Sequence, residues 1–361
     1  MELIDYQLKY FLLCLKKINI IIPKPIKMII SGMIIGDDIN LIASKNLFPY
    51  ILSLGDKVNM NHVLIGACKG GNLEMVVYAI SKGACNLNAG LDEACKCNHR
   101  EIVELLISGG ATHLNAGLDR ACRYGYTKIV ELLISGGANN LNDGLYYACR
   151  YGHREIVELL ISKGAYYLNN GLEVACEYGH REIVDLLISK GASNLNSGLR
   201  VACSSGHKEI ADLLISRGAD LNIGLYYASS YGQKEIVNLF ISRGANNLNS
   251  GLDTACSYGH KEIVDILISK GAYYLNNGLY YACRHNHIKI VELLISKGAD
   301  NLKSGIYQAR RYGHEKIVDL LISRGADNLN WGVYVTCKYC YKKIVDYILH
   351  SRKVIKKLWT C

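Results

Sequence analysis

The stretch "GHREIVELLISKGA", residues 152–165, decides the fold because the chain repeats it almost letter for letter. Near-copies begin at Gly179, Gly206, Gly232, Gly259 and Gly313. Looser copies begin at Gly71, Asn98, Gly125 and Asn286, and an eroded copy begins at Cys340. A repeat of roughly 20 to 50 residues is typical of proteins that stack one small helical or sheet motif many times.

The period is regular along most of the chain. Aligning the copies on a Gly-Leu pair gives eleven repeats, spaced by 27 residues except for 26 between Gly198 and Gly224. The repeats start at Val63, Gly90, Gly117, Gly144, Gly171, Gly198, Gly224, Gly251, Gly278, Gly305 and Gly332. They fill residues 63–351, and residues 352–361 form a basic tail. Residues 37–62 resemble a degenerate repeat that caps the stack, whereas residues 1–36 match no pattern.

Each repeat is predicted to contain two helices, of which the first is short. Leu145, Ala148 and Cys149 stand at positions i, i+3 and i+4, so they line one face of that helix. Asp143 is a good N-cap residue and is expected to begin it. The same position holds Asn170, Ser197, Ser250, Asn277 and Ser304.

The second helix is predicted to follow His153. Glu155 falls in its first turn, where the helix dipole favours an anion. Its apolar face consists of Ile156, Val157, Leu159, Leu160 and Ile161. Gly164 is expected to end it in a left-handed conformation. Helices of this length are marginal in water without packing, so neighbouring repeats must cover each other and form an all-α solenoid.

These residues carry a family resemblance. "GHREIVELLISKGA" followed by "LN" resembles the second helix and loop of the ankyrin-repeat family, over residues 63–351. The resemblance implies helix-turn-helix repeats whose first helices and loops form a concave protein-binding face. The family repeat has about 33 residues and a Gly-x-Thr-Pro-Leu-His stretch, which "NNGLEVAC", residues 169–176, replaces here. We therefore expect shortened hairpin loops. Such short repeats are similar to those of ankyrin-repeat proteins of giant DNA viruses of the mimivirus type.

A column of cysteines follows the small residue of each first helix. It comprises Cys68, Cys95, Cys122, Cys149, Cys176, Cys203, Cys256, Cys283 and Cys337. Buried free cysteine behaves as a small hydrophobic residue, and stacked helices lie too far apart for disulfides. Ser229 and Arg310 also interrupt the column. We expect core packing rather than a metal site.

The sequence offers no catalytic machinery. His153, His180, His207, His260 and His314 recur at the turn between helices, where a structural role is expected. The "HNH" at residues 285–287 is a weak signal, and nucleotide-binding, hydrolase and metalloprotease motifs are missing from the sequence. We therefore predict a protein that is not an enzyme and that uses no cofactor and no metal.

Charge and hydropathy narrow the possible partners. The net charge of +9 comes from the ends, because residues 63–337 carry 27 basic and 26 acidic side chains. Nucleic-acid binding is therefore an alternative function only for the basic tail "SRKVIKKLWTC". No apolar run reaches the length of a membrane span, and no signal peptide is recognisable. We expect a cytoplasmic monomer, in the host cell if the protein is viral, with nuclear import through the tail as an alternative.

The residues that vary between repeats indicate the binding face. The two positions after Gly-Leu alternate between charged residues and tyrosine pairs, and tyrosine and arginine are enriched in interface hot spots. The predicted partner-binding residues, here called the tyrosine face, are Tyr146, Tyr147, Arg150, Tyr166, Tyr167, Tyr226, Tyr227, Tyr273, Tyr274, Tyr280, Tyr281 and Arg284. We predict a protein-binding scaffold. The alternative is that duplication of the repeats also copied their surface tyrosines, without any binding role. A ubiquitin-ligase adaptor is an alternative function, although residues 1–62 show no recognisable F-box.

Overall fold

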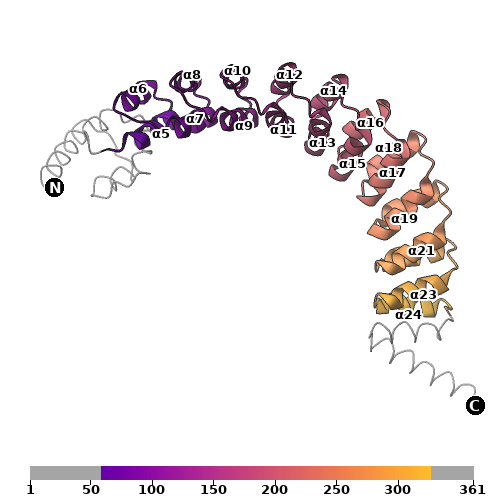
Figure 1. Ribbon diagram of the computed structural model, residues 1–361. Coiled ribbons are helices and arrows are strands. Elements are labelled where there is room, and N and C mark those ends of the chain that lie inside the picture. Colours follow the sequence, from indigo (N-terminus) through magenta and orange to yellow (C-terminus); the bar gives the residue numbers. More distant parts are fainter. Residues whose placement is uncertain (1–57, 327–361) are drawn as a thin grey trace, which may run out of the picture. The chain divides into compact units, whose positions relative to one another are not determined.

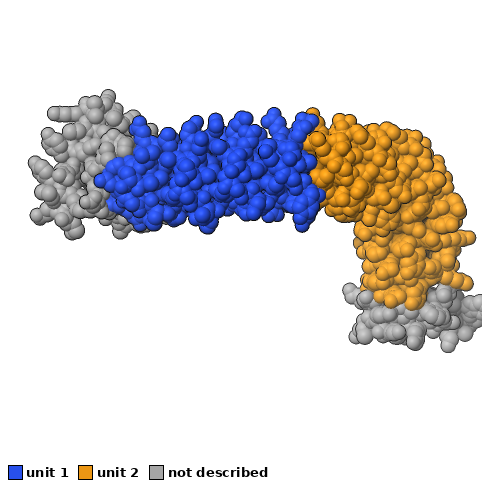
Figure 2. Space-filling view, turned by 45° about the horizontal axis from the view of Figure 1, so that its top comes forward, with its two compact units in different colours: residues 1–167 blue, residues 168–361 orange. Residues whose placement is uncertain are grey.

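The structure is a computed structural model, and it describes residues 58–326. The unassigned segment 1–36, nearly all of the capping segment 37–62, the eleventh repeat from Gly332, Cys337 and the basic tail lie outside the described residues. The ligase-adaptor and nucleic-acid alternatives rest on those segments. The chain divides into two compact units, Met1–Tyr167 (unit 1) and Leu168–Cys361 (unit 2), and the division falls between two repeats of the sequence (Figure 2).

Unit 1 contains four described repeats, each with a first and a second helix. The first helices are α5 (Met60–Gly70), α7 (Leu87–Lys96), α9 (Leu114–Tyr124) and α11 (Leu141–Tyr151). The second helices are α6 (Leu73–Ser81), α8 (Arg100–Ser108), α10 (Thr127–Ser135) and α12 (Arg154–Ser162). In Figure 1 the first helices of this unit lie in one row and the second helices in another.

Unit 2 contains six described repeats of the same kind. Its first helices are α13 (Leu168–Tyr178), α15 (Leu195–Ser205), α17 (Leu221–Ser230), α19 (Leu248–Tyr258), α21 (Leu275–Arg284) and α23 (Leu302–Arg311). Its second helices are α14 (Arg181–Ser189), α16 (Lys208–Ser216), α18 (Lys234–Ser242), α20 (Lys261–Ser269), α22 (Ile288–Ser296) and α24 (Glu315–Ser323). Residues 58–326 contain no strand, so the all-α solenoid with shortened loops is confirmed.

The core is continuous between neighbouring repeats within each unit. Leu145 and Ala148 of α11 are fully buried, as are Val157 and Leu160 of α12. Burying each such leucine stabilises the fold by about 1.5–3 kcal/mol. Since neither helix of a repeat can bury its apolar face alone, the stability of each unit comes from contacts between adjacent repeats.

The predicted beginning of the first helix is wrong. Helix α11 begins at Leu141, with Asn140 at its N-cap, so Asp143 lies inside the first turn. The corresponding Asn170, Ser197, Ser250, Asn277 and Ser304 also lie inside their helices. The extra turn forms because Leu141 is half-buried and Asn142 binds the following loop through its side chain. The second helix agrees with its prediction, because α12 has Glu155 in its first turn and Gly164 has φ +105°.

The glycine of each Gly-Leu pair has a packing role inside the first helix. A Cβ atom on Gly144 would lie 3.1 Å from Sγ of Cys122 in the preceding repeat. Only glycine permits this close approach of the two helices, which outweighs its poor helix propensity. The eight cysteines of the column within the described residues are buried, as expected. Burial raises the pKa of the Cys149 thiol to about 12, so the thiol stays protonated at neutral pH.

Candidate functional site

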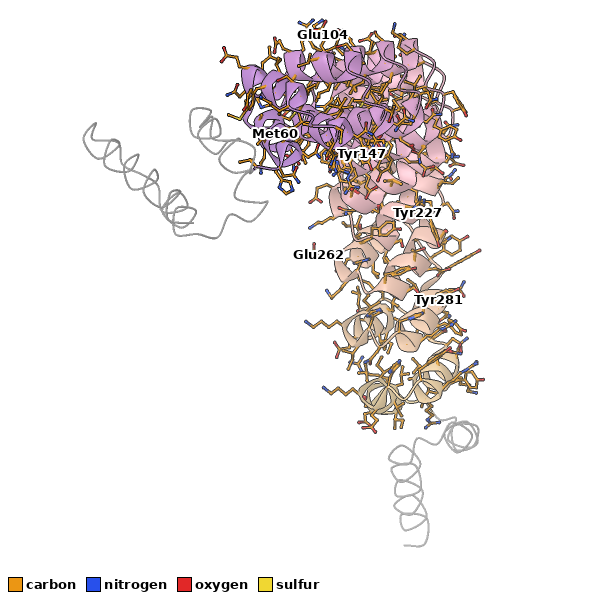
Figure 3. The ribbon with its side chains drawn as sticks, turned by 60° about the vertical axis from the view of Figure 1, so that its left-hand side comes forward. Met60, Glu104, Tyr147, Tyr227, Glu262 and Tyr281 are labelled. Atoms are coloured by element: carbon orange, nitrogen blue, oxygen red, sulfur yellow. The ribbon has the colours of Figure 1, made fainter. Side chains whose placement is uncertain are left out.

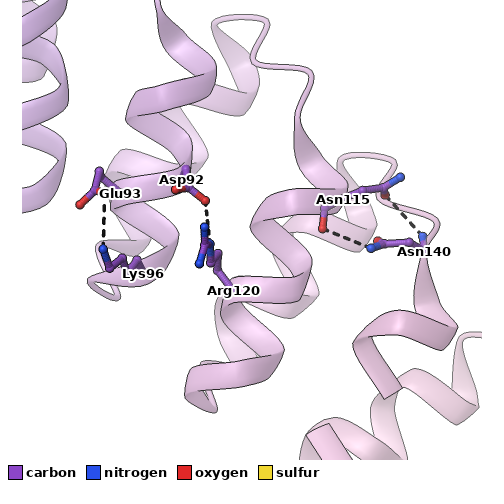
Figure 4. Close-up of polar contacts among 6 residues, drawn as sticks. All are labelled: Asp92, Glu93, Lys96, Asn115, Arg120 and Asn140. Atoms are coloured by element: carbon purple, nitrogen blue, oxygen red, sulfur yellow. Dashed lines mark hydrogen bonds and ion pairs between the residues drawn. The ribbon is translucent and has the colours of Figure 1, made fainter. Parts of the chain in front are cut away.

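Asparagine side chains fix the loops that carry part of the tyrosine face. In unit 1, Oδ1 of Asn142 accepts hydrogen bonds from the backbone amides of Tyr166 and Tyr167, at 2.9 and 3.0 Å. In unit 2, Asn249 accepts from the amides of Tyr273 and Tyr274, at 2.9 and 3.1 Å. Figure 4 shows the related contact of Asn115 with Asn140. This role was not predicted from the sequence, although the recurrent "LN" at the start of most first helices was its signal.

Histidines at the turns join consecutive repeats. Nε2 of His153 donates to the backbone carbonyl of Arg123 in the preceding repeat, at 3.1 Å. The ring also fills the space beside Gly125, where a Cβ atom would lie 2.6 Å from it. Equivalent bonds join His99 to Lys69, His207 to Glu177, His260 to Ser230, His287 to Ser257 and His314 to Arg284. These bonds hold the last turns of six first helices in place against the following repeat.

The helical tyrosines of unit 1 are half-buried rather than fully exposed. The rings of Tyr146 and Tyr147 meet edge to face, with their centroids 5.4 Å apart. Nη1 of Arg150 donates to the Tyr146 hydroxyl at 3.1 Å. The guanidinium of Arg123 lies over the Tyr147 ring, 4.8 Å from its centroid. Two predicted residues, Tyr146 and Arg150, are thus in contact, and Arg123 joins them as a residue that the sequence analysis did not select.

The loop tyrosines are more open to solvent. Tyr166 is 69% exposed and Tyr167 is 54% exposed, and their ring centroids lie 4.7 Å apart. Tyr273 and Tyr274 of unit 2 form a similar pair, at 4.8 Å. Rigid, exposed aromatic pairs of this kind offer a large contact area at low entropic cost.

The helical tyrosines of unit 2 follow the same geometry with a different arginine contact. The pairs Tyr226–Tyr227 and Tyr280–Tyr281 each have centroids 5.2 Å apart. In Figure 3, Tyr227 and Tyr281 lie on one side of this unit, opposite Glu262 of a second helix. Arg284 lies over the ring of Tyr312 in the next repeat, 5.5 Å from its centroid. The structure therefore does not pair Arg284 with Tyr280.

A second set of tyrosines escaped the sequence analysis. These residues occupy the position at or just after the end of the first helix, and each exposes more than a third of its surface. They are Tyr124, Tyr151, Tyr178, Tyr231, Tyr258 and Tyr312. Their signal was the recurrent Tyr-Gly before the turn. They extend the aromatic surface beyond the twelve predicted residues.

Charged groups lie among the tyrosines. Nε of Arg120 binds a carboxylate oxygen of Asp92 in the preceding repeat at 2.9 Å, as Figure 4 shows. Burial raises the pKa of Asp253 to about 6, and burial together with the nearby Asp143 raises the pKa of Asp119. Within residues 58–326, no group of three or more His, Cys, Asp or Glu side chains is placed to hold a metal ion. In the same part of the chain, no helix is long and apolar enough to cross a membrane.

Comparison with known proteins agrees with the geometry. A family model described as ankyrin repeats (3 copies) matches residues 118–171, 169–224, 225–305 and 252–330. No curated protein matches the chain. Because the matched residues cover more than half of the chain, and because their helices stack as helix-turn-helix repeats, the chain belongs to the ankyrin-repeat family.

Proposed function

We propose that this chain is a non-enzymatic scaffold that binds protein partners through the tyrosine face. Ankyrin repeats generally mediate protein–protein interaction. The observation that carries the proposal is the pairing of rigid, solvent-accessible tyrosines on first helices and loops. Tyr166 and Tyr273, each 69% exposed, are held in place by the asparagine bonds to their own amides.

The tyrosine pairs support a binding role because packing does not require them. The two positions that hold Tyr280 and Tyr281 in α21 hold Asp253 and Thr254 in α19, although both helices have the same backbone and the same buried leucine and alanine. The fold therefore does not dictate which residues stand at these two positions. Tyrosine next to arginine at such positions has the composition of an interface hot spot.

The resemblance of the repeat to those of giant DNA viruses supports a narrower version of the proposal. In that version the partner is a host-cell or viral protein, met in the cytoplasm of the host. The identity of that partner has to come from an affinity-capture experiment, because the fold does not specify it.

Affinity capture from a host-cell lysate tests the proposed face. The test variant carries Tyr146→Asp and Tyr147→Thr in unit 1, and Tyr280→Asp and Tyr281→Thr in unit 2. The chain itself uses Asp and Thr at the equivalent positions 253 and 254, so the helices should persist. We expect this variant to lose the partners that the natural chain captures.

The matched control changes exposed residues on second helices. Glu104→Ala and Glu262→Ala alter α8 and α20, away from the first-helix row of each unit (Figure 3). The control should keep every partner, and circular dichroism should show equal helix content in both variants. Equal capture by the natural chain and the tyrosine variant would show that the tyrosine face is not the binding surface.

A further inference from the structure

The last turn of the first helices differs in charge between the two units. In unit 1 the residue after the column cysteine is a cation in all four described repeats. We call Lys69, Lys96, Arg123 and Arg150 the basic row. In unit 2 the same position holds Glu177, Ser204, Ser230, Ser257, Arg284 and Arg311. Unit 1 thus has an unbroken row of cations that unit 2 lacks.

The fold does not dictate this charge. The carbonyl groups of Lys69 and Arg123 in unit 1 accept hydrogen bonds from histidines of the next repeat, and so do those of Glu177 and Ser230 in unit 2. A cation near a helix C-terminus stabilises the helix through its dipole, and unit 2 lacks such a cation at four of these positions. Within the row, these histidine bonds fix the last turns that carry Lys69 and Arg123.

Two cations of the row lie outside the ion pairs of the described residues, although Arg123 interacts electrostatically with Asp119 of the same helix. Lys69 is exposed and, like Arg123, makes no ion pair within residues 58–326. Lys96 lies 3.6 Å from Glu93, one turn back in its own helix. The guanidinium of Arg123 is held by the Tyr147 ring. Arg120 is the contrast in the same helix, because its charge is matched by Asp92 at 2.9 Å.

We propose that the basic row binds an extended acidic segment of the partner protein, an inference that rests on the proposed function. Stacked helices lie about 8–10 Å apart. An extended peptide in the polyproline II conformation advances about 3.1 Å per residue and repeats its side-chain direction every three residues, so its side chains come into step with the row at every third residue. The ligand is therefore a segment with glutamate or aspartate at every third position. The carboxylates bind the row, and the intervening residues contact Tyr146 and Tyr147.

The charges around the row favour a peptide over a nucleic acid. Asp92, Glu93 and Asp119 lie on the same first helices, and residues 63–337 carry 27 basic against 26 acidic side chains. A continuous polyphosphate would meet these carboxylates, whereas binding to nucleic acid calls for an unbroken basic surface. A peptide with uncharged residues between its carboxylates avoids them.

Fluorescence anisotropy with purified full-length protein tests the inference. The probe is a labelled peptide with glutamate at every third residue, separated by serine and glycine. The row variant carries Lys69→Ser, Lys96→Ser and Arg123→Ser, because serine occupies this position in unit 2. The control variant removes an equal charge from exposed positions of unit 1 outside the row, through Lys82→Ser, Arg154→Ser and Lys163→Ser.

We expect the row variant to bind the peptide about tenfold more weakly than the natural chain, because it loses three modest charge contacts together. The control variant should bind within about twofold, because its charges lie outside the row. A peptide of the same composition with consecutive glutamates should also bind more weakly. Equal weakening by both variants, equal binding of both peptides, or tighter binding of single-stranded oligouridylate would overturn the inference. So would the absence of peptide binding. If tyrosine-dependent capture from lysate persists in any of these cases, the acidic ligand is wrong while the proposed function stands.

Discussion

Units 1 and 2 use the same contacts between repeats and different side chains beside them. Asn142 in unit 1 and Asn249 in unit 2 each hold two loop amides, at distances that differ by little. At the last turn of the first helix, Arg123 in unit 1 is replaced by Ser257 in unit 2, yet both carbonyl groups accept a histidine bond. The asparagine and histidine bonds between repeats therefore recur in both units. The side chains beside these bonds differ, and we expect them to be the positions that select a partner.

Replacing a buried leucine with aspartate should give the largest loss of stability. It tests whether contacts between adjacent repeats stabilise both units. Leu160 in unit 1 and Leu267 in unit 2 are fully buried. We expect Leu160→Asp and Leu267→Asp each to reduce the free energy of unfolding by about 3–5 kcal/mol, because an unpaired charge is buried. Hydrogen exchange should show lost protection around α12 in the first variant and around α20 in the second.

The exposed Glu158 of α12 provides the control for this comparison. Glu158→Ala should change stability by no more than about 0.5 kcal/mol. Identical exchange patterns in the two leucine variants would contradict the nearest-neighbour architecture, because the damage would then not depend on the site.

The asparagine bonds should matter equally in both units. Asn142→Ala and Asn249→Ala each remove an acceptor shared by two backbone amides, so we expect a loss of about 1–2 kcal/mol in urea denaturation. The amides of Tyr166 and Tyr273 should exchange faster in the respective variants. Asn142→Asp keeps the acceptor oxygen and should retain most of the stability. A large effect in one unit only would show that the loops are held differently.

The column residue should make glycine substitution costly at position 144 of unit 1 and nearly harmless at position 251 of unit 2, where serine replaces cysteine in the column. An alanine Cβ at position 144 meets Sγ of Cys122, and one at position 251 meets the smaller Oγ of Ser229, each at 3.1 Å. Crowding costs more against sulfur, and alanine gains about 1 kcal/mol of helix propensity. We expect Gly144→Ala to destabilise the protein by about 1 kcal/mol and Gly251→Ala to be close to neutral, by thermal unfolding. Adding Cys122→Ser should rescue the first variant, and a failed rescue would point to a different clash.

The smallest effect is a pH dependence in unit 2. Burial raises the pKa of Asp253 from the ordinary 3.8 to about 6. The folded state therefore binds more protons between these values, so this group lowers stability as pH rises from about 4 to about 6. Asp253→Asn should be more stable than the natural chain at pH 7, by under about 1 kcal/mol because the group is half-buried, and equally stable below pH 4. Urea midpoints of both proteins at pH 7 and below pH 4 measure this difference in stability. If the variant stayed more stable below pH 4, burial of the ionised Asp253 carboxylate would not be the cause.

The sequence predicted what is local. Leu145, Ala148 and Cys149 were assigned to the buried face from spacing alone, and Val157 and Leu160 likewise, because a helix of regular geometry fixes which residues share a side. The start of the first helix was wrong because Asp143 is a typical capping residue. Nothing local to the sequence shows that Asn142 is already inside the helix and bound to the loop that follows.

Contacts between repeats were less predictable. His153 was assigned to its own turn, whereas its ring binds the carbonyl of Arg123, 30 residues earlier in the chain. Periodicity alone does not tell on which side a turn meets its neighbour. The residues of the tyrosine face stay predictions. Tyr226 is exposed and the other helical tyrosines of the face are half-buried, and the second tyrosine set adds to them at the ends of the first helices.

The asparagine bond has a direction that matters while the protein is being made. The acceptor of Asn142 precedes the amides of Tyr166 and Tyr167 by 24 and 25 residues, so it leaves the ribosome first. The histidine bond has the same polarity, since the carbonyl of Arg123 is synthesised before His153. Within each unit, a newly emerged segment thus finds its docking groups already displayed on the segment made before it. The nascent chain can add one layer at a time, each onto bonding groups of the layer made before it.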